Sequence, residues 1–210
     1  MISLEDYKKD ILNNLMIMSR TANGIIDIST SNTKVDSLLV SDGDIAKQIA
    51  IKNFIDTIEF CYENKNKEFK DIKELRSFIE EIALRINKGI VAEGKLYRNG
   101  GESNKFKYVK IAEIDETMDK YCGLILNEQD PIKAAALSEF YINYRGHFFS
   151  DGCGKTSMMV SAYCLMRKDV KVASYISRES YFKSEPQTYD DDVSDFNRFY
   201  NYFKSLHGVN

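Results

Sequence analysis

Apolar residues recur every three or four positions along most of the chain, a period that predicts amphipathic helices. Ser3 and Asp71 stand where helix N-caps are expected, and Asp130 followed by proline is a strong helix opening. Glu74, three residues after Asp71, completes a predicted capping box. The predicted helices cover 4–18, a segment from Asp44 to Tyr62, 71–90, a short segment from Asp115, 132–145, 155–167 and 193–206.

The apolar stripes of these helices predict which side chains enter the core. In the second helix the inward residues are Ile45, Ile49, Ile55, Ile58 and Tyr62, and in the third they are Ile72, Leu75, Ile79, Ile82, Ile86 and Ile90. The segment 93–111, "EGKLYRNGGESNKFKYVKI", differs, because glycines and an asparagine precede alternating apolar residues. That pattern predicts a turn and a short strand or hairpin. The fold class is therefore mainly α, a helical bundle with one small β element.

The length and composition of the chain fit one domain, or one domain with an arm. The chain has 210 residues, 43% of them hydrophobic, and a net charge of −3. This charge argues against a broad nucleic-acid or anionic-membrane surface. The four cysteines show no CxxC pairing, so we expect neither a disulfide framework nor a zinc site. The first residues contain no apolar signal-like run, which predicts a cytoplasmic protein, with secretion by a signal-independent route left open.

One stretch interrupts the helical pattern and carries candidate chemistry: "GHFFSDGCGKTSMM", residues 146–159. The letters GCGKTS resemble the end of a phosphate-binding P-loop. That motif needs a glycine five residues before Gly154, where this chain has Phe149. The preceding segment also has helical rather than strand spacing. Both requirements fail, and the P-loop interpretation is rejected.

The same stretch resembles the motif of the Fic family, HxFx(D/E)GNGRxxR, with His147, Phe149, Asp151, Gly152 and Gly154 in register. The family places this motif on a loop between two helices. The resemblance extends to "INKGIVAEGKLYR" (86–98), to "NKFKYVKI" (104–111) at the place of the family's flap hairpin, and to "SRTANG" (19–24), which is similar to an N-terminal inhibitory segment. It covers roughly residues 15 to 205. We accordingly divide the chain into an N-terminal helical arm, 1–40, and a Fic-like core, 41–210.

The resemblance implies transfer of AMP from ATP, with Mg²⁺, to a Ser, Thr or Tyr hydroxyl of a target protein. His147 would be the catalytic base, Asp151 would hold the metal, and Phe149 would anchor the loop in the core. The remaining implied roles fall into three groups: nucleotide binding by Ser150, Gly152, Cys153, Gly154, Lys155 and Tyr181, target docking on a flap of Phe106, Lys107, Tyr108 and Val109, and an inhibitory-like helix containing Ser19, Asn23 and Gly24. A homodimer is compatible with the sequence.

Four positions depart from the family pattern. Cys153 replaces the motif asparagine, Lys155 and Met158 replace its two arginines, and Asn23 replaces the inhibitory glutamate. Losing one preorganised donor lowers a rate by about 10² to 10³. Two alternatives to AMP transfer therefore stay open: a catalytically impaired module that binds a nucleotide or partner, and an enzyme that transfers another phosphate-containing group, such as the γ-phosphoryl group.

Overall fold

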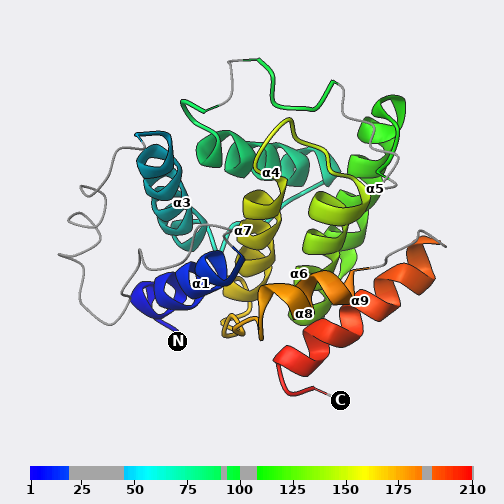
Figure 1. The fold of residues 1–210 in the computed structure, drawn as a ribbon. Helices are drawn as coiled ribbons and strands as arrows, with labels where there is room; N and C mark the ends of the chain where they lie inside the picture. The colour runs from blue at the N-terminus through cyan, green and yellow to red at the C-terminus, as the bar shows by residue number, and fades with distance from the viewer. Residues whose placement is uncertain (19–44, 91–93, 100–107, 186–190, 210) are drawn as a thin grey trace.

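The computed structural model describes residues 1–18, 45–90, 94–99, 108–185 and 191–209, and it is mainly helical (Figure 1). The predicted fold class is confirmed. In chain order the elements are α1 (Leu4–Met18), α3 (Ile45–Glu63), α4 (Ile72–Ile86), the short 3₁₀ turn η1 (Ile111–Glu113), α5 (Ile114–Asn127), α6 (Pro131–Glu139), the π-helical turn η2 (Phe140–Arg145), α7 (Cys153–Met166), α8 (Arg178–Ser184) and α9 (Asp192–Leu206).

Helix α7 is the centre of the core. Every residue from Thr156 to Met166 is buried, since the sequence "TSMMVSAYCLM" carries no charge and its polar groups are small. Helices α6, α4 and α3 pack around it, and α1 also contacts it (Figure 1). The loop that precedes α7 lies at the end of the molecule away from both chain termini (Figure 1).

The predicted caps Ser3, Asp71 and Asp130 begin their helices where the sequence places them, but the predicted capping box is wrong, because the Glu74 carboxylate accepts from the Lys70 amide at 3.0 Å and not from the Asp71 amide. The Asp71 carboxylate accepts from the Glu74 amide at 2.9 Å, and the Asp130 carboxylate accepts from the Ile132 amide at 2.9 Å. The Ser3 hydroxyl accepts from the Asp6 amide at 3.2 Å. These caps satisfy backbone donors that would otherwise lack partners.

Two of the predicted apolar stripes are wrong in part. Ile49 on α3 and Ile72 on α4 are each 37% exposed, whereas Phe54 and Cys61 on α3 are completely buried. Helix α3 has apolar residues on several faces, so packing against α4 and α7 decides which face is inward. The third helix ends at Ile86, four residues before Ile90, which is exposed.

The predicted flap is only partly within the described residues. Phe106 and Lys107 lie outside them, and Tyr108, Val109 and Lys110 form no strand. The prediction that the strand reaches Ile111 is wrong, because Ile111 begins η1, in which the Glu113 amide donates to the Lys110 carbonyl at 2.9 Å. Between described residues the only β-type pairing is one antiparallel bridge, Tyr97 with Phe149.

The N-terminal helix α1 packs into the same core as the rest of the chain. Tyr7 and Ile11 are completely buried, and the Asn14 side chain donates to the Ala173 carbonyl at 2.9 Å and accepts from the Tyr175 amide at 2.9 Å. The inhibitory-like residues Ser19, Asn23 and Gly24 and the proposed boundary at residue 40 lie outside the described residues.

The four cysteines lie in helices α3, α5 and α7. All four cysteines are free and buried, as expected of small apolar side chains in helices. None of the helices within the described ranges is long and apolar enough to cross a membrane.

Candidate active site

The candidate site is the loop between η2 and α7, and a widened helical turn precedes it. The Gly146 amide donates to the Tyr141 carbonyl at 2.7 Å, five residues back, which makes the end of this helix a π-turn. A Cβ atom at Gly146 would lie 2.2 Å from the Phe148 ring and 2.6 Å from the Tyr141 carbonyl oxygen. Only glycine therefore fits at this entry to the loop.

Two aromatic side chains fix the middle of the loop. Phe148 and Phe149 are both buried, as predicted for Phe149. The backbone of the loop also pairs with residues 96–98: the Arg98 amide donates to the Phe148 carbonyl at 3.0 Å, and the Ser150 amide donates to the Leu96 carbonyl at 2.9 Å. The loop is thus held on one side by the core and on the other by a short extended segment.

His147, directly before the two phenylalanines, has a left-handed backbone conformation, with φ of 43°. Its Nδ1 lies 2.9 Å from the Asn143 carbonyl oxygen. A carbonyl can only accept, so Nδ1 carries the proton and the neutral ring keeps Nε2 as its basic nitrogen. The Tyr108 ring stacks on the imidazole, with centroids 4.2 Å apart and planes 8° from parallel.

Burial is the main reason why the pKa of His147 is lowered below its ordinary value. The hydrogen bond to Asn143 acts in the opposite direction, and the nearby charge of Arg98 lowers this pKa further. The imidazole is therefore neutral near pH 7 and can accept a proton.

The end of the loop leads into the first turn of α7. The Asp151 side chain is exposed and accepts from the Gly152 amide at 2.6 Å, while its carbonyl accepts from the Asn87 side chain at 3.1 Å. Gly152, the N-cap of α7, has φ of 68° and offers no side-chain cap. Gly154 is exposed beside it and Lys155 is half-buried. Uncapped amides at a helix N-terminus favour an anion.

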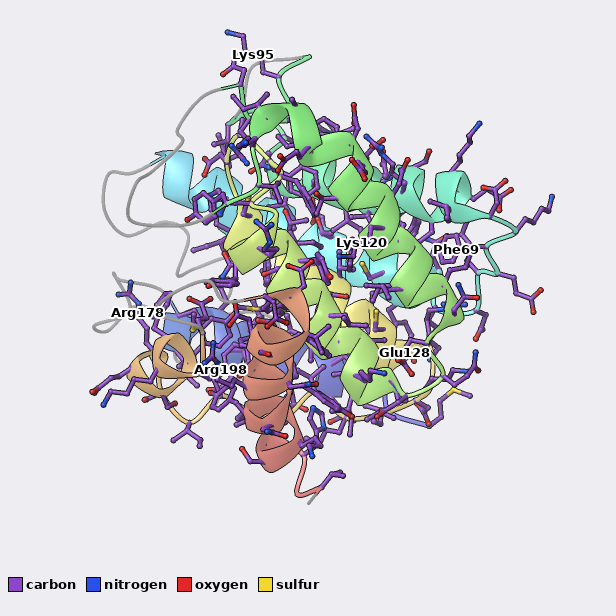
Figure 2. All side chains as sticks on the ribbon, turned by 90° about the vertical axis from the view of Figure 1, so that its right-hand side faces the viewer. Phe69, Lys95, Lys120, Glu128, Arg178 and Arg198 are labelled. Atoms are coloured by element: carbon purple, nitrogen blue, oxygen red, sulfur yellow. The ribbon has the colours of Figure 1, made fainter. Side chains whose placement is uncertain are left out.

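Three side chains that were predicted to contact the nucleotide make hydrogen bonds within the protein. The Cys153 thiol is buried and donates to the Phe149 carbonyl at 3.3 Å, and burial raises its pKa to about 12, so it stays neutral. The Tyr181 ring is buried and its hydroxyl donates to Glu139 at 2.6 Å. The Ser150 hydroxyl donates to the carbonyl of Lys95 at 2.6 Å, and Lys95 projects outward at the edge of the molecule (Figure 2).

A metal site built from protein side chains alone is absent from the described residues, which contain no group of three or more His, Cys, Asp or Glu side chains that could hold an ion. Mg²⁺ bound with a nucleotide needs only one or two carboxylates in addition to phosphate oxygens. The exposed Asp151 carboxylate next to the amides of α7 fits that requirement. The other chemistry of the site comes from His147 and the helix N-terminus.

Two solved structures resemble the chain over almost its full length. A Fic domain containing signaling protein from Bacteroides thetaiotaomicron superposes with a TM-score of 0.70 at 16% identity, covering 99% of this chain and 90% of that chain. The chain has a Fic fold. A Fic family protein from Desulfovibrio desulfuricans gives a TM-score of 0.63 at 16% identity, covering 98% of this chain and 63% of that one. No protein-family model matches the sequence, and no curated protein matches it.

Several residues that shape the site within this Fic fold were not predicted from the sequence. Asn143 holds the imidazole through its carbonyl, and its side-chain amide donates to Glu185 at 3.3 Å. Arg98 bonds to the loop from the opposite side, with its Nε donating to the His147 carbonyl at 2.7 Å. Asn87 braces Asp151. These side chains act mostly on backbone carbonyls, which have no sequence signature; the only available signal was the position of Arg98 at the end of "GKLYR".

Proposed function

We propose that this protein is a Fic-type nucleotidyltransferase that transfers AMP from ATP to a Ser, Thr or Tyr hydroxyl of a target protein. The observation that carries the proposal is the orientation of His147. Its imidazole is neutral, its Nδ1–H donates a hydrogen bond to the Asn143 carbonyl, and its Nε2 remains a base. The uncapped N-terminus of α7 lies at the end of the same loop, where phosphates would bind.

In the proposed reaction Nε2 of His147 takes the proton of the target hydroxyl. The oxygen forms a bond to the α-phosphorus of ATP, the bond from that phosphorus to the bridging oxygen breaks, and pyrophosphate leaves. The product is a phosphodiester between AMP and the target side chain, and the imidazolium returns its proton to solvent. Mg²⁺ held by Asp151 would neutralise charge on the phosphates.

The amides at the start of α7 would receive the phosphate group, with Lys155 adding a positive charge. Gly152 and Gly154 let the backbone approach, because neither carries a side chain that would cover these amides. Val109 supports flap docking less directly, since its amide already donates to the Arg145 carbonyl at 3.0 Å. The other predicted docking residues, Phe106 and Lys107, lie outside the described residues, so strand docking on them stays a prediction.

A second candidate is a Fic-fold module that binds a nucleotide without turning it over. Two observations favour it: the Cys153 thiol faces the Phe149 carbonyl, and Met158 is buried in the core with 6% of its surface exposed. Neither side chain offers a strong donor to phosphate. These are the positions at which the resembled motif has an asparagine and an arginine.

The test is label transfer from ATP carrying the label at the α or the γ phosphate, with Mg²⁺ and a cell lysate as the source of targets. AMP transfer predicts that α label reaches protein, that His147→Ala abolishes it, and that the matched control His207→Ala leaves it unchanged. Transfer of γ label alone means phosphoryl transfer. Nucleotide binding without transfer supports the binding module, and transfer that survives His147→Ala overturns the proposed mechanism.

The loop itself offers a second test of the two candidates. The double variant Cys153→Asn with Lys155→Arg restores an amide donor and a two-point cation. If the loop is a weakened AMP-transfer site, the variant should raise the transfer rate or tighten ATP binding. A fall in both quantities in a folded variant would contradict AMP transfer as the function of this loop.

A further inference from the structure

Arg98 places a buried positive charge directly beneath the candidate loop. Only 7% of this residue is exposed. Its Nε donates to the His147 carbonyl at 2.7 Å, and its Nη2 donates to the carbonyls of Val109 and, at 3.4 Å, Gly146. One guanidinium thus joins the end of the predicted flap to the start of the loop.

The partners of this charge are unusual. A buried cation is ordinarily paired with a carboxylate, because removing a lone charge from water is unfavourable. All the hydrogen-bond acceptors of the Arg98 side chain among the described residues are backbone carbonyls, and its Nη1 has no hydrogen-bond partner there. An apolar residue at this position would leave the carbonyls of His147, Val109 and Gly146 without these donors, so the guanidinium is specific for the backbone arrangement around the loop.

The contacts of Arg98 connect two segments that meet at His147. One contact is with the carbonyl of His147 itself, whose backbone is in the left-handed region. Another is with the carbonyl of Val109, and the preceding residue, Tyr108, stacks on the imidazole. The Val109 amide also donates to the Arg145 carbonyl at 3.0 Å. A displacement of the flap end would therefore move both the stacking ring and the guanidinium.

We propose that Arg98 is a positioning residue that holds the His147 imidazole in its reactive orientation by joining Val109 at the flap end to Gly146 and His147 of the loop. The role rests on the proposed function of His147 as a base. It also gives the flap end a physical connection to that base, because the same guanidinium bonds to the carbonyls of Val109 and His147.

The charge of Arg98 has a separate effect from its geometry. It contributes to lowering the pKa of His147, which keeps the ring neutral. Among the described residues, Arg98 is the charge that acts on the pKa of His147, and the titratable Tyr108 of the flap end stacks on the ring. Glu185, at the end of α8, acts from further away by accepting from Asn143, whose carbonyl holds Nδ1. Lysine at position 98 would keep the charge but lose the fork that reaches several carbonyls.

The experiment compares Arg98→Lys, Arg98→Gln and a matched control, Arg167→Gln. Arg167 also donates to a backbone carbonyl, that of Lys67 at 3.2 Å, but it follows the opposite end of α7. The protein has only two histidines, so NMR resolves the imidazole signals of His147 and His207, and His207→Gln assigns them. The signals are followed from pH 5 to 8 without nucleotide or target, and transfer of α label is measured in parallel.

Both Arg98 variants should reduce the ring-current shift that Tyr108 imposes on His147, and both should lower the transfer rate by about 10². The titration midpoint of His147 should rise in Arg98→Gln and stay close to wild type in Arg98→Lys, with His207 unmoved. Full transfer by Arg98→Lys would mean that charge, not positioning, is what matters, and would overturn the proposal.

Two other results would also overturn the proposal that Arg98 positions His147. Unchanged His147 signals in a folded Arg98→Gln would overturn the proposal, and so would unfolding of both Arg98 variants while Arg167→Gln stays folded, since Arg98 would then serve the whole fold. The NMR arm needs no activity. A shifted His147 signal in a protein that transfers no label would retain the positioning role and refute only the proposed function.

Discussion

Glu139 is a buried carboxyl group whose ionisation should make the stability of the protein depend on pH. It lies at the end of α6, with 2% of the residue exposed. The Tyr175 hydroxyl donates to one of its oxygens and the Tyr181 hydroxyl to the other, the latter at 2.6 Å. Burial raises the pKa of Glu139 from 4.5 to about 7, and the two tyrosine hydrogen bonds only partly oppose this shift.

The sign of the effect follows from proton binding. Between pH 4.5 and about 7 the folded protein holds a proton on Glu139 that the unfolded chain has lost. Stability contributed by this protonated group is therefore complete below pH 4.5 and decreases as the pH rises through 7. The difference between the two pKa values corresponds to a loss of about 3 kcal/mol. Glu185, whose pKa is raised by burial and by Glu139 to about 8, should add a loss of its own.

The substitution that isolates this effect is Glu139→Gln, which keeps an acceptor and the side-chain volume but cannot ionise. Urea unfolding is measured at pH 5, 6, 7 and 8 for the wild type, for Glu139→Gln, and for Glu68→Gln as a control at an exposed position. The decrease in unfolding free energy from pH 5 to 8 should be smaller in Glu139→Gln by up to about 3 kcal/mol. Parallel pH profiles for Glu139→Gln and the wild type would refute the reasoning, whatever their vertical offset.

Three further predictions use single sites. Gly152→Ala should destabilise the fold more than Gly89→Ala. Both glycines have positive φ, which costs about 1 kcal/mol for alanine, but of the two only Gly152 would bring a Cβ against a side chain, 2.6 Å from Asn87 Oδ1. Equal losses of stability in thermal unfolding would exclude that contact. Asp71→Ala should lower the free energy of unfolding, measured with urea, by about 1 kcal/mol because the N-cap of α4 is lost, and Asp71→Ser should lower it much less. Label transfer should rise with pH about a midpoint below the ordinary pKa of histidine, because burial lowers the pKa of His147. A midpoint above that ordinary value would contradict this prediction.

Local signals predicted the fold well. Asp71 and Asp130 begin their helices because a cap depends only on residues two or three positions away. The inward face of α3 could not be predicted in the same way, since Ile49 and Phe54 are both apolar and their burial depends on where α4 and α7 lie. The π-turn before the loop had no signal either. It differs from an ordinary helix end by the shift of a hydrogen bond from the Gly146 amide to the Tyr141 carbonyl.

The residues of the candidate site also differ in whether local sequence signals could predict them. His147, Phe149 and Gly152 could be predicted because their side chains, or the lack of one, carry the motif. Arg98 and Asn143 could not, because they act on or through backbone carbonyls that every residue possesses. Tyr181 was predicted to bind the nucleotide from its place in the sequence after the motif helix. The structure puts its ring in the core, where its hydroxyl is 3.5 Å from the Asn143 side-chain nitrogen.

The conformation of His147 is the strongest argument that the loop serves more than the fold. A residue other than glycine in the left-handed region is disfavoured by about 1 to 2 kcal/mol, and this imidazole is also partly removed from water. Glycine at position 147 would avoid both penalties while the two phenylalanines still anchored the loop. Strain of this kind persists where the surrounding structure imposes it and clusters at functional sites. Here Arg98 bonds to the His147 carbonyl and the Asn143 carbonyl fixes the Nδ1 proton, and a neutral imidazole held in this way suits the proposed general base.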